Sequence, residues 1–158
     1  MKNKGIIIAI VVMIVIIMGW WLASPLFISK TVNEQLPIVA DSSESINSNQ
    51  ESEIKIELQG SFVDADSFHK TSGTAKVVVI DGKKYLSLEN FQTTNGPDLY
   101  IYLSKDLEAK EFVNLGELKG NIGNQNYEIL ESVDINSYNK AIIWCKAFSV
   151  LFGSAELN

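Results

Sequence analysis

The chain contains one cysteine, Cys145, and one histidine, His69, and these two side chains offer the clearest chemistry. A lone thiol can be an inert packing residue, half of an intermolecular disulfide, or a reactive group. A cysteine and a histidine can also form a nucleophilic pair, in which the imidazole accepts the thiol proton. Asp64 or Asp66, both close to His69 in sequence, would then orient the imidazole. The residue types alone leave all of these alternatives open.

Composition argues against several multi-ligand metal sites. Blue copper takes two histidines, a cysteine and a weak axial methionine, but this chain has one histidine and its three methionines are Met1, Met13 and Met18. A structural zinc site needs four nitrogen or sulfur ligands, and an iron–sulfur cluster needs several thiolates. We therefore predict no metal site of these kinds and leave the identity of any cofactor unknown.

The charge pattern argues against nucleic-acid binding. All 13 basic residues are lysines, against 19 acidic residues, which gives a formal net charge of −6. Without arginine the chain lacks the forked guanidinium groups that recognise phosphate and guanine. No basic stripe compensates for this, so we expect no nucleic-acid partner.

An apolar segment without charged residues extends over residues 5–29. It exceeds the roughly 20 residues that a helix needs to cross a bilayer. Lys2 and Lys4 precede it, which favours a cytoplasmic N-terminus and an extracytoplasmic remainder. A cleavable signal peptide is the alternative, although the segment is long for one and Pro25 follows the small residues Ala23 and Ser24. We predict a signal-anchor helix within residues 1–30, contact with the bilayer through residues 5–29, and a single-pass protein of the cell membrane.

The sequence changes character twice after this segment. Residues 31–53 are polar and acidic, so we predict a disordered linker. From residue 54 short alternating runs begin, and residues 77–80 and 85–88 flank Asp81-Gly82, a strong hairpin signal. Further strand candidates occupy residues 99–103, 112–118, 127–130 and 141–145. We predict that residues 54–158 form an all-β domain, an antiparallel sandwich or barrel of about 7–9 short strands.

The strand predicted at residues 141–145 gives Cys145 a definite setting. Alternation places Ile143 and Cys145 on one face, and Ile142 and Trp144 on the other. Free cysteine is often buried, so the pattern alone favours a packing role over a reactive thiol. His69 is predicted to lie in a loop, and it could serve Cys145 only if the fold brought the two together.

Two sequence blocks resemble the DM-thirteen domain family. They are Asn-Gly-Pro-Asp-Leu-Tyr at residues 95–100 and Trp-Cys-x-x-Phe at residues 144–148, and the likeness extends over about residues 60–157. The resemblance implies an all-β extracytoplasmic module with an electron-transfer role. It maps the characteristic cysteine of the family onto Cys145 and its histidine onto His69. Trp144 and Asp98, one from each block, are the candidate cofactor-binding residues.

Three functions follow as hypotheses. The first is a membrane-tethered redox module, in which Cys145 is the active thiol or a single metal or haem ligand, supported by Trp144 and His69. Because one thiol cannot run a dithiol cycle alone, it would need the thiol of a redox partner protein, a cofactor supplied from elsewhere, or a sulfenic-acid step. The second is a cell-surface module that binds a protein or glycan through residues 93–98 and the exposed face of residues 99–102. The third is a Cys–His hydrolase, which requires Cys145 and His69 within hydrogen-bonding reach.

Overall fold

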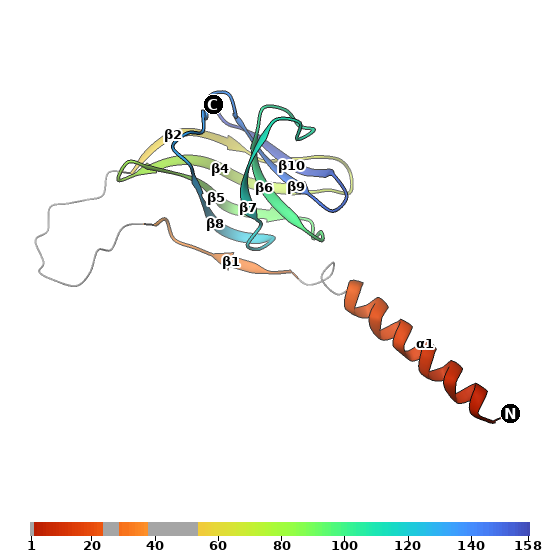
Figure 1. The fold of residues 1–158 in the computed structure, drawn as a ribbon. Helices are drawn as coiled ribbons and strands as arrows, with labels where there is room; N and C mark the ends of the chain where they lie inside the picture. The colour runs from red at the N-terminus through yellow and green to blue at the C-terminus, as the bar shows by residue number, and fades with distance from the viewer. Residues whose placement is uncertain (1, 24–28, 38–53) are drawn as a thin grey trace, which may run out of the picture.

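Two five-stranded β-sheets pack face to face in the computed structural model (Figure 1). The structure describes residues 2–23, 29–37 and 54–158. One helix, α1 (Lys2–Ala23), precedes ten strands. The strands are β1 (Thr31–Asn33), β2 (Lys55–Ser61), β3 (Val63–Asp64), β4 (Thr71–Ile80), β5 (Lys83–Thr93), β6 (Leu99–Ser104), β7 (Phe112–Glu117), β8 (Ile122–Ile129), β9 (Lys140–Cys145) and β10 (Val150–Glu156).

The order of the strands confirms the predicted sandwich. One sheet runs β1-β8-β5-β4-β2 and the other runs β3-β10-β9-β6-β7. All neighbouring pairs are antiparallel except β1 and β8, which are parallel. The number of strands exceeds the predicted 7–9, because β1 and β3 are too short to give a recognisable alternation.

The predicted hairpin at Asp81-Gly82 is present and joins β4 to β5. Both residues have positive φ, 49° and 81°, and Ile80 pairs directly with Lys83 across the turn. A two-residue turn of this kind matches the right-handed twist of the flanking strands. It fixes the register of the two longest strands, and therefore the side chains that face the core.

The core lies between the sheets and is built by alternation. Leu99, Ile101 and Leu103 of β6 face it, as do Ile143 and Cys145 of β9. Tyr100 and Trp144 form a cross-strand pair between these residues and point to the other face. The predicted division of β9 into two faces is therefore confirmed.

The predicted linker over residues 31–53 is wrong at its beginning. Thr31–Asn33 forms β1 and extends the first sheet beside β8. The physical reason is a set of tertiary contacts that composition does not reveal, including the Glu34 carboxylate held by Lys119. Residues 38–53 of the predicted linker lie outside the described residues.

Helix α1 covers most of the apolar segment, and Figure 1 draws it apart from both sheets. Its described side chains are those of Ile6 and residues 8–20, and all of them are exposed. A search of the described residues finds no helix that is both long and apolar enough to cross a membrane. Membrane anchoring therefore stays a hypothesis from the sequence.

Candidate functional site

Cys145 is the last residue of β9 and lies at one end of the sandwich. It pairs with Leu99 of β6 on one side and with Val150 of β10 on the other. Its side chain faces the core and is 1% exposed. The two flanking strands therefore hold the thiol in place, and bulk solvent does not reach it in this arrangement.

The thiol is connected to the loop formed by residues 95–98. The Sγ–H of Cys145 donates a hydrogen bond to the carbonyl oxygen of Pro97, with 3.1 Å between sulfur and oxygen. The next backbone N–H, that of Lys146, donates to the carbonyl oxygen of Asp98 at 3.0 Å. Only the protonated thiol can donate. The closed arrangement thus ties Cys145 to the 95–98 loop.

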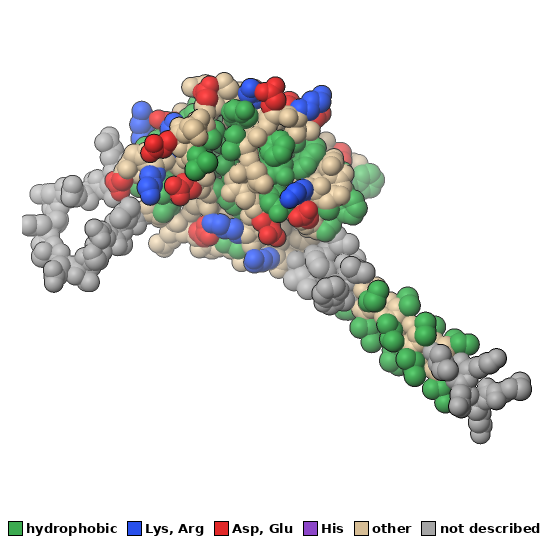
Figure 2. All heavy atoms as spheres, in the orientation of Figure 1, with side chains coloured by type: hydrophobic (Ala, Val, Ile, Leu, Met, Phe, Trp, Pro, Cys, Tyr) green, Lys and Arg blue, Asp and Glu red, His purple; other side chains and the backbone are tan. Residues whose placement is uncertain are grey.

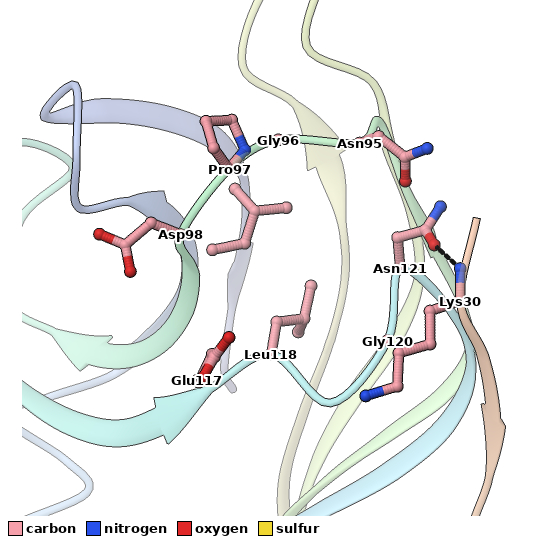
Figure 3. Close-up of a pocket in the computed structure, with 10 residues that line it drawn as sticks. Lys30, Asn95, Gly96, Pro97, Asp98, Glu117, Leu118, Gly120 and Asn121 are labelled. Carbon is pink, nitrogen blue, oxygen red and sulfur yellow. Dashed lines mark hydrogen bonds between the residues drawn. The ribbon is translucent and has the colours of Figure 1, made fainter. Parts of the chain in front are cut away.

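The same loop also lines a cavity of about 260 Å³, which we call the Lys30 pocket (Figure 3). The first residue of β6, the last residue of β7, the loops before β6 and before β8, and Lys30 from the segment after α1 meet here. The lining residues are Lys30, Asn95, Gly96, Pro97, Asp98, Leu99, Glu117, Leu118, Gly120 and Asn121. Cys145 is not among them, although Pro97, which accepts its hydrogen bond, is.

Of the two candidate cofactor-binding residues, only Asp98 lines the Lys30 pocket. Asp98 has a positive φ of 64°, so the loop turns sharply before β6 begins. Trp144 lies on the outer face of β9, opposite Tyr100 of β6 and Leu151 of β10. A group bound to Cys145 inside the core would therefore not touch Trp144, which occupies the other side of the sheet.

His69 is tied to its own loop. Its Nδ1 lies 2.7 Å from Oδ2 of Asp66, and the other oxygen of Asp66 accepts the backbone N–H groups of Phe68 and His69. The hydrogen bond with the His69 side chain, followed by these two backbone hydrogen bonds, lowers the pKa of Asp66 to about 2. The structure thus joins His69 to Asp66, one of the two predicted orienting carboxylates.

His69 and Cys145 form no hydrogen bond with each other among the described residues, and each has a different partner. The His69 ring packs on the Phe152 ring at a centroid distance of 4.3 Å, and a Cβ added at Gly96 would lie 2.8 Å from that phenylalanine ring. This arrangement does not provide the thiol–imidazole contact that a Cys–His hydrolase requires.

Sequence reasoning missed two polar networks that fix the loops around the pocket. In the first, the hydroxyl of Thr71 donates to the carbonyl oxygen of Phe152 at 2.8 Å and contacts the hydroxyl of Thr93 at 2.8 Å. This pair connects the two sheets beside the His69 loop. A threonine in a strand is usually an exposed residue, so the sequence does not indicate the buried contact between Thr71 and Thr93.

The second network surrounds the buried side chain of Gln125. Its amide donates to the carbonyl oxygen of Gly120 at 2.7 Å, and its oxygen accepts from the Tyr127 hydroxyl at 2.8 Å. The Tyr127 hydroxyl in turn accepts from the backbone N–H of Lys119 at 3.0 Å. Burial raises the pKa of Tyr127 above its usual range. The strand period, which puts Gln125 on the same face as Tyr127, is the one sequence signal for this contact.

Within residues 2–23, 29–37 and 54–158, no group of three or more histidine, cysteine, aspartate or glutamate side chains is placed to hold a metal ion. The described site therefore consists of one thiol, the 95–98 loop that contacts it, and the Lys30 pocket that the loop lines.

A family model described as "Electron transfer DM13" matches residues 61–157 of the chain. The chain matches no curated protein and no solved structure. The match includes the 95–98 loop, His69, Trp144 and Cys145, and it ends one residue before the last residue of the chain. Because the match spans more than half of the sequence, the chain belongs to the Electron transfer DM13 family.

Proposed function

We propose that this protein is an extracytoplasmic electron-transfer module in which Cys145 is the redox-active group. Family membership supports the general role. One observation carries the assignment to this residue: the only thiol of the chain donates a hydrogen bond to Pro97, a residue that also lines the Lys30 pocket. The thiol thus contacts the loop that forms part of the pocket wall.

The chemistry requires a second reactant, since a single thiol cannot form an internal disulfide. In the proposed step, the Cys145 sulfur forms a mixed disulfide by attacking a disulfide of the partner. The sulfur of Cys145 loses its proton and is oxidised, and the departing partner sulfur takes up the electron pair and a proton. The disulfide of the partner protein is the oxidant. The chain returns to the thiol when a thiol of a third molecule, the reductant, attacks the partner's sulfur in the mixed disulfide, forms a new disulfide with it, and releases the Cys145 sulfur, which takes up a proton.

Such a step requires the 95–98 loop to move. The hydrogen bonds from Cys145 to Pro97 and from Lys146 to Asp98 hold the loop closed. Gly96 adds a close packing contact with the Phe152 ring. Opening would break these contacts and expose the sulfur to the disulfide of the partner, which the thiolate form of a cysteine attacks. The loop would therefore act as the gate of the redox site.

The proposal includes a membrane anchor at residues 5–29. The supporting observations are the absence of charge over this segment, the lysines before it, and the exposed apolar side chains of α1. The N-terminus would then lie in the cytoplasm and the two-sheet domain outside. An anchor would hold the domain where membrane-bound or extracytoplasmic redox partners act.

Incubation of the folded full-length chain with glutathione disulfide tests the redox assignment. The expected product carries one glutathionyl group on Cys145, it is released by a thiol reductant, and it is absent in Cys145→Ser. Mass spectrometry of the intact protein gives the readout. A native wild-type protein that gains no glutathionyl group, while the same protein in denaturant does, would contradict the proposal.

A binding role is the second candidate, and the outer face of the β6–β9 pair favours it. Trp144 and Tyr100 are partly exposed cross-strand neighbours there, and Lys146 Nζ lies 5.1 Å from the centre of the Tyr100 ring. Exposed aromatic rings of this kind bind sugars and protein side chains. Calorimetric titration with a panel of soluble oligosaccharides tests this role. The binding role predicts that the wild type and Cys145→Ser bind an oligosaccharide and that Trp144→Ala does not. If the wild type binds none of the oligosaccharides, the role is rejected for these ligands.

A further inference from the structure

The chain enters the sandwich at one definite end. The backbone N–H of Lys30 donates to Oδ1 of Asn121 at 2.6 Å, and the carbonyl oxygen of Lys30 accepts from the N–H of Ile122 at 3.3 Å (Figure 3). Thr31 then pairs with Ile122 as β1 begins. The residue that fixes the entry point is therefore only a few positions after the end of α1 at Ala23.

The entering segment is held firmly along β1. Both oxygens of Glu34 accept from Lys119 Nζ, at 2.8 and 2.9 Å, and one also accepts the N–H of Asn126 at 3.0 Å. The backbones also approach closely, because a Cβ added at Gly120 would lie 2.5 Å from the carbonyl oxygen of Lys30. The domain therefore has a fixed orientation relative to residue 30.

Four loops share this end of the sandwich, which we call the entry end: residues 65–70, 94–98, 118–121 and 146–149. The strand register shows this, because Thr71 pairs with Thr93, Gln92 pairs with Ile122, and Leu99 pairs with Cys145. Figure 1 shows the loop before β4 and the turn between β9 and β10 at the end of the domain nearer α1.

Two phenylalanines project from the entry end. Phe68, in the 65–70 loop, is 82% exposed, and Phe148, in the 146–149 turn, is 69% exposed. Figure 2 shows hydrophobic side chains standing out at this end of the domain. Nothing in the described part of the chain covers either ring. Lys70 and Lys146 lie two positions from these rings in the sequence, with exposed side chains; Lys70 Nζ donates to Asp64 at 3.0 Å and Lys146 Nζ lies over the Tyr100 ring.

Covalent geometry limits how far this end can lie from α1. At about 3.6 Å per residue, the seven steps from Ala23 to Lys30 span at most roughly 25 Å. If α1 crosses a bilayer, the entry end must lie close to the surface of that bilayer. An aromatic ring gains free energy in the interfacial layer, where its apolar faces leave water.

We infer that the entry end lies against the lipid bilayer, with the rings of Phe68 and Phe148 inserted in the interfacial layer. This inference rests on the proposed membrane anchor. The continuity of the chain with α1 selects the bilayer as the occupant, because that surface is held next to the two rings at high effective concentration. The Lys30 pocket and the 95–98 loop then face the membrane surface, and reactants reach them along it.

Spin labels on the full-length chain in phosphatidylcholine vesicles test the inference. Phe68→Cys and Phe148→Cys, each in a Cys145→Ser background, carry a nitroxide. Leu130→Cys is the matched control, since Leu130 is 66% exposed and follows β8 at the opposite end of the domain. A nickel chelate, present on both sides of the bilayer, reports exposure to water, and oxygen reports contact with lipid. Circular dichroism and thermal melting check that each variant folds.

We expect the labels at positions 68 and 148 to be several-fold less accessible to the nickel chelate than the label at position 130. We also expect them to be more accessible to oxygen than that label. Equal nickel accessibility at all three positions, in protein that floats with the vesicles, would overturn it and leave the anchor standing. Protein that does not float with the vesicles would overturn the anchor and this inference together.

Discussion

The sulfur of Cys145 lies 3.1 Å from the carbonyl oxygen of Pro97, although the two residues are 48 positions apart in the chain. This hydrogen bond connects the end of β9 to the loop that precedes β6. It helps to cover the thiol, and it makes the 95–98 loop part of the proposed redox site.

Replacement of Cys145 by alanine should destabilise the fold. The change removes the donor to the buried Pro97 carbonyl and leaves a small cavity, for an expected loss of about 1–3 kcal/mol in the free energy of unfolding. Cys145→Ser retains a donor and should lose less. Chemical denaturation of the three proteins gives the comparison, and an alanine variant as stable as the wild type would show that the hydrogen bond contributes nothing.

Gly96→Ala should expose the thiol without unfolding the domain. The added methyl group would lie 2.8 Å from the Phe152 ring and 2.9 Å from the Leu99 side chain, so these side chains or the loop must shift, and we expect the closed state to weaken. A closed state that is weaker by about 1.4 kcal/mol accelerates labelling of Cys145 about tenfold. The rate of reaction with a maleimide under native conditions measures this effect.

Gly60→Ala is the matched control for this experiment. A Cβ there would lie 2.0 Å from the carbonyl oxygen of Glu156, in a crowded contact between β2 and β10 far from the 95–98 loop. The control should lower the stability of the fold and leave native-state labelling of Cys145 slow. Equal acceleration by both variants would mean that labelling follows general destabilisation.

Tyr127→Phe tests the buried network that holds the loop of residues 118–121. Loss of the hydroxyl leaves the N–H of Lys119 without its acceptor and removes a donor to the side-chain oxygen of Gln125. We therefore expect a loss of about 1–3 kcal/mol in the free energy of unfolding. Tyr85→Phe, on the neighbouring strand β5, removes a hydroxyl outside this network and should change stability little. Similar losses in both variants would argue against the network.

The pH dependence of Tyr127 provides a second readout of the same network. Burial raises its pKa above the usual value near 10. A raised pKa means that the folded state favours the neutral form of Tyr127. The contribution of this side chain to stability is therefore complete below pH 10 and is lost as pH rises further. Ultraviolet absorbance should show a tyrosine that ionises only together with unfolding.

Glu34→Gln should release β1 from β8. Burial acts to raise the pKa of Glu34, but the hydrogen bond from Lys119, the Asn126 N–H and the Lys119 charge together lower it below 4.5. The carboxylate therefore stabilises the docked strand above that pH, and the contribution disappears as pH falls through the lowered pKa. With both side chains more than a third exposed, we expect about 0.5–1 kcal/mol.

Hydrogen exchange of the backbone N–H groups of residues 31–34 measures the release of β1. Exchange should become faster in Glu34→Gln at neutral pH, and faster in the wild type when salt is added. Lys119→Met should reproduce the effect from the other side of the ion pair. Unchanged exchange in both variants would show that the ion pair does not hold β1.

The sandwich could be predicted because its signals are local. Alternation along residues 99–103 and 141–145 assigns the core faces, and Asp81-Gly82 specifies a hairpin turn by its need for positive φ. By contrast, Thr31–Asn33 is too short for a periodic signal, and its pairing depends on β8, far along the chain. Such long-range contacts have no local signature.

The sequence identified the segments that form the candidate site, but it did not identify the contacts between their atoms. The blocks around Asp98 and Cys145 were identified, and the structure brings them together at adjacent strand ends. The sequence could not show that the thiol meets the Pro97 carbonyl, or that His69 packs on Phe152 instead of approaching Cys145. These contacts depend on the relative placement of β6, β9 and β10, which alternation leaves undetermined.

The denaturant dependence of Cys145 labelling tests the gated thiol most directly. At low denaturant, opening of the 95–98 loop alone exposes little surface, so the account predicts a labelling rate that is nearly independent of denaturant concentration. The rate should also exceed the rate expected from global unfolding. Labelling that follows the full denaturant dependence of global unfolding at every concentration would contradict the account, because Cys145 would then be a core residue that no native motion exposes.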